Sequence, residues 1–80
     1  RSYPKDARQA DVTRNLAVAY AEAGRPGDAA AEFERISANV AEEREVRREA
    51  LQSAAELYEK ANDRGRSAAM LERFVKEYPT

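Results

Sequence analysis

The sequence predicts an all-α fold, with four antiparallel helices that form two stacked helix-turn-helix repeats. Helical spacing, interrupted by one turn, connects six positions in the first half: Leu16, Tyr20, Gly24, Ala29, Phe33 and Ile36. The same intervals recur 38 residues later, at Ala54, Tyr58, Asn62, Ser67, Leu71 and Phe74. Alanine, the strongest helix former, supplies 17 of the 34 hydrophobic residues. Self-similarity at this length is typical of proteins built from stacked helical repeats.

The first helix is predicted over residues 5–23. Asp6 and Gln9 have the spacing of a capping box, which satisfies backbone N–H groups at a helix start. Small and apolar residues follow with helical periodicity: Ala10, Val12, Leu16, Ala17, Tyr20 and Ala23. Gly24 suits the left-handed conformation that ends many helices, and Pro26 suits the first turn of the next one. A turn this short makes the first two helices antiparallel neighbours.

The second and third helices are predicted over residues 26–37 and 40–61. The second should face the first through Ala29, Ala30, Phe33 and Ile36. Asn39 and Glu42 form another capping-box pattern at the start of the third helix. The extra residues between the two repeats suggest a lengthened third helix, although the sequence does not distinguish a helix extension over residues 39–45 from an insertion. The expected apolar residues of the third helix are Ala50, Leu51, Ala54, Leu57, Tyr58 and Ala61.

The fourth helix is predicted over residues 64–78. Asn62 occupies the position that Gly24 has in the first copy, and asparagine tolerates the left-handed conformation better than most residues. Asp63 is the expected N-cap, and Pro79 the expected stop. The predicted inner face consists of Ser67, Ala68, Leu71, Phe74 and Val75.

Composition excludes several classes of function. The 14 basic and 15 acidic residues nearly cancel, whereas a dedicated nucleic-acid binder needs a basic face, so we expect no nucleic-acid partner. Cysteine and histidine are both absent, which removes disulfides, thiol nucleophiles, imidazole bases and the usual zinc ligands. No apolar run is long enough for a membrane span. We therefore expect no enzyme activity, no catalytic residues, no cofactor and no metal.

The two copies resemble the tetratricopeptide repeat, a pair of helices with a usual period of about 34 residues. The resemblance rests on Leu16, Ala17 and Tyr20 in the first helix, and on Gly24, Ala29, Phe33 and the closing Pro79. It implies a right-handed α-solenoid, with one repeat at about 5–38 and a second at about 40–79. Residues 1–4 would then be the tail of a preceding repeat, because Tyr3-Pro4 matches Tyr78-Pro79. Since the chain opens with Arg1, we expect it to be part of a longer array.

The ending LERFVKEYP is similar to repeats of bacterial envelope proteins, including the periplasmic coordinator of the Tol-Pal system and outer-membrane assembly lipoproteins. That similarity favours the periplasm or cell envelope as the compartment, although the sequence contains no direct signal for location.

Three glutamates of the third helix, Glu49, Glu56 and Glu59, allow two interpretations. Carboxylates on one side of a helix can hold a metal ion or act as acid and base, which would suit a metal-dependent enzyme. They can also form a solvated acidic face, which is the simpler interpretation in a chain of which 36% is charged.

The resemblance also implies a binding surface, because successive first helices line a concave face in this family. The residues expected there are Asp11, Arg14, Val18, Ala21, Glu49, Gln52, Glu56 and Glu59. Val18 and Glu56 occupy positions where relatives that clamp a chaperone's terminal carboxylate have asparagine, so no such clamp is predicted. The acidic third helix favours a basic or mixed-charge protein or peptide.

The predicted function is thus a protein–protein interaction module that performs no chemistry. The alternative is a structural segment that stacks on other repeats or associates with itself, as a homo-dimer formed through exposed repeat ends, with no separate ligand.

Overall fold

Four α-helices make up the chain in the computed structural model, which describes the backbone of residues 5–79 and the side chains of residues 12–79. They are α1 (Lys5–Glu22), α2 (Pro26–Ala38), α3 (Arg44–Lys60) and α4 (Arg64–Glu77). No strand occurs in this described range, so the predicted all-α class is confirmed. The proposed capping box at Asp6 and Gln9, the side chain of Ala10 and the Tyr3-Pro4 pair lie outside the described residues.

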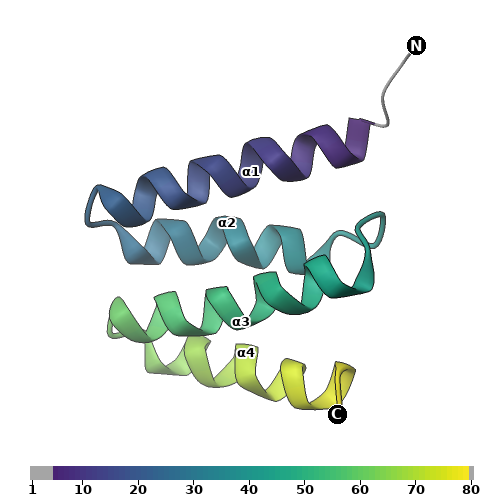
Figure 1. The fold of residues 1–80 in the computed structure, drawn as a ribbon. Coiled ribbons are helices and arrows are strands. Elements are labelled where there is room, and N and C mark those ends of the chain that lie inside the picture. The colour runs from purple at the N-terminus through teal and green to yellow at the C-terminus, as the bar shows by residue number, and fades with distance from the viewer. Residues whose placement is uncertain (1–4, 80) are drawn as a thin grey trace.

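The helices lie side by side in chain order, and each runs opposite to the one before it (Figure 1). The main contacts join consecutive helices, with α2 against α3 the most extensive. The array measures 43 × 33 × 14 Å. Since the order is linear, α1 and α4 are each packed against one neighbour, whereas α2 and α3 are packed on both sides.

Both short turns have the conformations expected from their residues. Gly24 and Asn62 have φ angles of +79° and +63°, in the left-handed region that glycine and asparagine tolerate best. Pro26 is the first residue of α2, and the Asp63 carboxylate accepts a hydrogen bond of 3.2 Å from the backbone N–H of Arg66. The ends of α1 and α3, the two turns and the starts of α2 and α4 are each 38 residues apart, as the repeated pattern predicts.

The predicted start of the third helix at residue 40 is wrong, because α3 begins at Arg44. The Asn39 side chain accepts a hydrogen bond of 3.0 Å from the backbone N–H of Ala41, and the Asn39 carbonyl accepts another of 3.0 Å from Glu42. Asparagine thus stabilises a local turn, which competes with its use as a helix cap. The extra residues between the repeats form a loop and do not lengthen the helix.

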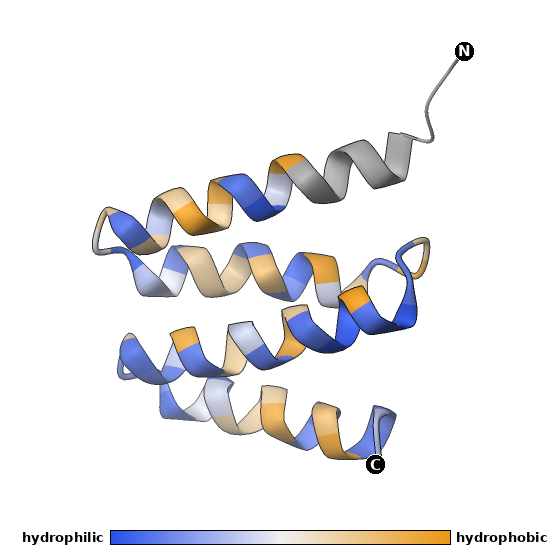
Figure 2. Cartoon of the chain, viewed as in Figure 1, coloured by the Kyte–Doolittle hydropathy of each residue, from blue (hydrophilic) through white to orange (hydrophobic). Residues whose placement is uncertain are grey.

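The hydrophobic core is centred on α3. Leu51 is fully buried, and the cluster around it consists of alanines, a methionine and two tyrosines from α2, α3, α4 and the residue after α4: Ala30, Ala54, Ala55, Tyr58, Met70 and Tyr78. Phe33, Leu57 and Phe74 pack against this cluster. Hydrophobic and hydrophilic residues alternate along the helices (Figure 2). Alanines keep the helices close together but bury little area each.

The inner face of α4 differs from the prediction. Ser67 is buried and Phe74 is half-buried as expected, but Met70, which the sequence analysis missed, is the most buried apolar side chain of this helix. Three residues predicted to face inward are exposed: Ala68, Leu71 and Val75. The helix has two apolar stripes on different sides, and the prediction combined residues from both.

Candidate functional site

Of the eight residues expected to bind a partner, the structure describes the side chains of seven, on α1 and α3. On α3, all four are exposed: Glu49, Gln52, Glu56 and Glu59. On α1, Val18 and Ala21 are exposed and Arg14 is half-buried, while the side chain of Asp11 lies outside the described residues. We call the described seven residues the α1/α3 face.

α3 contributes both to the core and to the α1/α3 face, because its buried and its exposed residues each recur with helical periodicity on different sides of the helix. Steps of three, four and three residues separate the exposed positions of α3 and keep them on one side over about 15 Å of its length. Leu51, Ala54 and Tyr58 fall between them and turn inward. The α1 positions lie 38 residues before Gln52, Glu56 and Glu59, so the two helices present equivalent sides.

The two halves of the α1/α3 face are on separate helices. α1 and α3 run in the same direction, and α2 lies between them in the array (Figure 1). The structure therefore brings the four α3 residues together along one helix, and it places the α1 residues beyond α2 rather than in direct packing with them.

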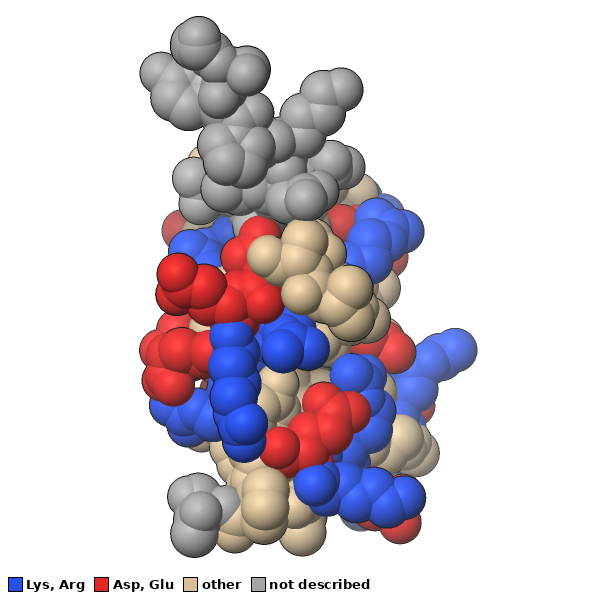
Figure 3. Space-filling model, turned by 90° about the vertical axis from the view of Figure 1, so that its right-hand side faces the viewer, with Lys and Arg blue, Asp and Glu red and all other residues tan. Residues whose placement is uncertain are grey.

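Three glutamates of α3, Glu49, Glu56 and Glu59, lie outside the ion pairs found among the described side chains. The ion pairs among the described side chains join residues three or four positions apart: Arg25–Asp28, Arg35–Glu32, Arg48–Glu45, Arg66–Asp63 and Arg73–Glu77. None of these pairs includes Glu49, Glu56 or Glu59. At the end of the array where α3 begins, positive and negative side chains are interleaved (Figure 3). The three glutamates are thus exposed and outside these ion pairs, with Arg48 near Glu49 and Lys60 one turn after Glu56, beside a mixed-charge end.

The metal interpretation of these glutamates has no geometry to support it. Glu49 and Glu56 are seven residues apart, which separates them by about 10 Å along the helix. Metal–oxygen bonds are about 2 Å long, so both carboxylates cannot bind one ion. Within the described part of the chain, no group of three acidic, histidine or cysteine residues could hold a metal.

The described helices also include none that is long and apolar enough to cross a membrane.

Two side-chain hydrogen bonds hold α3 between its neighbours. The Tyr58 hydroxyl donates to Glu34 Oε1 on α2 at 2.6 Å, and the Ser67 hydroxyl of α4 donates to the carbonyl of Ala55 at 2.9 Å. Burial of Tyr58, together with its hydrogen bond and proximity to Glu34, raises the pKa of Tyr58 to about 12. These contacts fix how α3 is rotated and hence where its acidic side points.

We predict that stability falls as Tyr58 ionises at high pH. Its raised pKa favours the neutral phenol in the folded state, so this contribution is complete below the unfolded pKa of about 10 and is lost as the pH rises toward 12. The loss should reach about 2 kcal/mol at the upper end of that range. Urea unfolding of the wild type and of Tyr58→Phe between about pH 9 and about pH 12 measures it.

The phenylalanine variant should start about 1 kcal/mol less stable, because it lacks the hydroxyl, and should then lose less stability than the wild type on raising the pH. Deprotonation of lysines affects both proteins equally. Parallel stability curves for the two proteins would contradict the assignment.

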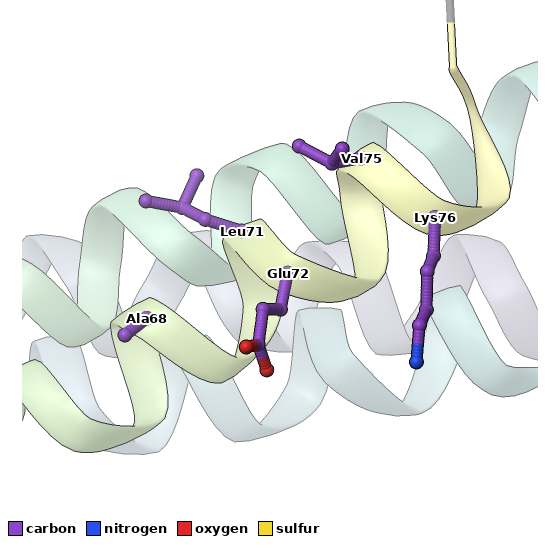
Figure 4. A pocket seen from close by; sticks show the side chains of 5 residues that line it. All are labelled: Ala68, Leu71, Glu72, Val75 and Lys76. Atoms are coloured by element: carbon purple, nitrogen blue, oxygen red, sulfur yellow. The ribbon is translucent and has the colours of Figure 1, made fainter.

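A second surface, on the outer side of α4, was missed by the sequence analysis. It forms an open hollow of about 500 Å³, lined by Ala68, Leu71, Glu72, Val75 and Lys76. Figure 4 shows the three apolar side chains in a row along the helix, with Glu72 and Lys76 extending from an adjacent side. The repeated pattern contained the signal for this surface, since Leu71 matches Phe33, which packs toward α3.

Comparison with known proteins gives one finding. Residues 49–80, from the middle of α3 to the end of the chain, match the model of a family described as tetratricopeptide repeat. No curated protein and no solved structure matches the chain. The match supports the resemblance inferred from the sequence, while the boundaries at 5–38 and 40–79 stay a prediction.

Proposed function

We propose that this chain, of which residues 49–80 match the model of a family described as tetratricopeptide repeat, binds a basic or mixed-charge protein segment on its α1/α3 face. Repeats of this family generally act as protein–protein interaction modules, and their exposed side chains determine the partner. The family is typically a scaffold without enzymatic activity, and we propose the same for this chain.

The observation that carries the proposal is the unpaired charge of α3. Glu49, Glu56 and Glu59 are exposed on one side of a rigid helix, and none takes part in the ion pairs of the described residues. Basic side chains of a partner could therefore pair with these glutamates without breaking an existing ion pair. The negative charge of the glutamates would also accelerate the encounter with a basic partner and disfavour acidic competitors.

The α1 side of the face contributes apolar contact. Val18 is 44% exposed and Ala21 lies one helical turn beyond it. A partner that follows the α1/α3 face would therefore combine basic side chains with some apolar ones, as in an amphipathic helix or an extended basic segment.

We expect a synthetic amphipathic peptide of lysine and leucine to bind the chain. A counterpart with glutamate at every lysine position should bind at least about ten times more weakly, and salt should weaken the binding of the lysine peptide. Gln52→Lys combined with Glu56→Lys should reduce affinity for the lysine peptide at least about ten-fold without changing the helix content. Fluorescence anisotropy of labelled peptides measures affinity, and circular dichroism measures helix content.

The matched control is Ala41→Lys combined with Glu43→Lys, which adds the same positive charge at exposed positions of the α2–α3 loop. It should bind the lysine peptide nearly as well as the wild type. Equal loss in both double variants would mean that only net charge matters, and unchanged binding in the first would exclude this face.

A further inference from the structure

The outer side of α4 is an apolar helix surface that no described residue covers. Leu71 is 52% exposed and Val75 is 69% exposed, although both are hydrophobic and lie on the same side of the helix as Ala68. This side contains the hollow shown in Figure 4. Contiguous exposed apolar residues of this kind mark contact surfaces more often than solvated ones.

The internal repeat indicates what kind of surface it is. The five residues that line the hollow correspond, 38 positions earlier, to Ala30, Phe33, Glu34, Ser37 and Ala38 of α2. Ala30 is fully buried, Ser37 is buried, and Phe33 packs against the core cluster that α3 dominates. The outer side of α4 therefore reproduces the side of α2 that receives α3.

The outer side of α1 resembles the side of α3 that packs against α2. Its exposed small and apolar residues are Val12, Leu16, Ala19 and Ala23, spaced by four, three and four positions. They correspond to Ala50, Ala54 and Leu57 of α3 and to Ala61 directly after it, which are buried or half-buried. Ala61 faces α2 directly, since its Cβ would be 3.7 Å from a Cβ added at Gly27.

We infer that two copies of this chain associate head to tail, with α1 of one copy packing on α4 of the other as α3 packs on α2. Each end of the array carries one half of an interface that the chain already forms internally. The helix order α1–α2–α3–α4 would then continue as α1 of the next copy. The two surfaces of this junction are separate from the α1/α3 face, and the association goes beyond the proposed function.

Two specific contacts would be repeated at the junction. Tyr58 donates to Glu34 within the chain, and the residues that correspond to them are Tyr20 on α1 and the exposed Glu72 on α4. The Tyr20 hydroxyl of one copy would donate to Glu72 of the other.

The second contact is a close approach of small residues. Ala61 lies over Gly27 within the chain, and the corresponding residues are Ala23 and Gly65. Among the described residues outside its own helix backbone and chain neighbours, a Cβ added at Gly65 would meet only Asp63 Oδ1, at 4.0 Å, so the place that Ala61 occupies against α2 is open on α4 there.

Association of this type uses two different surfaces, so it does not close at two copies. Each added chain leaves one α1 and one α4 surface exposed, and the product is an open series whose average mass grows with concentration. A symmetric dimer through α4 alone would stop at two chains. The stoichiometry therefore distinguishes the two arrangements.

The test uses two variants that each block one end. Leu71→Glu places a charge on the α4 surface, and Leu16→Glu places one on the α1 stripe, where the leucine is 42% exposed. Light scattering from micromolar to millimolar concentration should give a rising mass for the wild type and the mass of a single chain for each variant. An equimolar mixture of the two variants should form two-chain complexes and nothing larger, because only one intact pair of surfaces remains.

Tyr20→Phe should weaken wild-type association about five-fold, the effect of one lost hydrogen bond. Val40→Glu is the matched control, since this valine is 85% exposed in the α2–α3 loop and its replacement should leave association unchanged.

Circular dichroism verifies that each variant is folded. If Leu71→Glu or Leu16→Glu loses helix, Val75→Glu or Val12→Glu, respectively, is used in its place. A wild type that stays at the mass of one chain up to millimolar concentration would overturn the inference. Self-association of either end variant, or a mixture that stays monomeric, would overturn it as well.

Discussion

Replacing Leu51 with alanine is expected to bring the protein close to unfolding at ambient temperature. Leu51 is the largest fully buried side chain of the described residues and lies at the centre of the α2–α3–α4 cluster. Removing its isobutyl group costs about 2–5 kcal/mol, because transfer free energy is lost and a cavity remains. A domain of this size has about 4–12 kcal/mol of stability in total. This single change should therefore remove a large share of it.

Thermal unfolding followed by circular dichroism measures this effect, and a loss of about 3 kcal/mol should lower the Tm by about 12–24 °C. Leu71→Ala makes the same chemical change at a half-exposed position of α4, and it should cost less than about 1 kcal/mol in the single chain. Equal destabilisation by the two substitutions would contradict the placement of the core on α3.

The second large effect is expected from Ala54→Leu. Ala54 and Ala30 are both fully buried in the cluster between α3 and α2, where small side chains allow the two helices to approach closely. A leucine at residue 54 has no space, so the helices must separate or the side chain must adopt a strained rotamer. Overpacking of this kind costs about 1–3 kcal/mol, even though leucine is more hydrophobic than alanine.

Urea unfolding at neutral pH measures the stability of this variant. Ala69→Leu is its matched control, because Ala69 is exposed on α4 and the change in helix propensity is the same. The control should stay within about 0.5 kcal/mol of the wild type. An Ala54→Leu protein as stable as the wild type would show that α2 and α3 are not in close contact there.

The turns could be predicted from the sequence because their determinants are local. Gly24 and Asn62 tolerate positive φ, and Asp63 has an acceptor at the right distance from the N–H of Arg66. The loop after α2 could not be predicted in the same way, since Asn39 is suited both to a helix cap and to a turn. Both uses satisfy a nearby backbone N–H, so the residue pattern alone does not separate them.

The orientation of α4 was predicted incompletely for a similar reason. Helical periodicity identifies apolar positions but does not say which neighbour they face, and α4 has apolar residues on two sides. Met70 faces the core, whereas Leu71 and Val75 face outward. Comparison with α2 separates the two sides, because the position of Leu71 in the repeat is that of Phe33.

The residues of the α1/α3 face follow from the resemblance to the tetratricopeptide repeat, and in the structure six of the seven described ones are exposed, while Arg14 is half-buried. The pattern does not reveal that these glutamates have no ion-pair partner among the described residues, because pairing depends on side-chain geometry.

The most direct test of the proposed binding at the α1/α3 face is a titration of the chain with the lysine and leucine peptide, followed through backbone amide chemical shifts by NMR. We expect the largest changes along the exposed side of α3, at Glu49, Gln52 and Glu56, with further changes at Val18 of α1. The titration is made at a concentration where the chain is monomeric by light scattering, so that self-association does not contribute. Changes confined to Leu71 and Val75 on α4, or no changes at any concentration of peptide, would contradict the account.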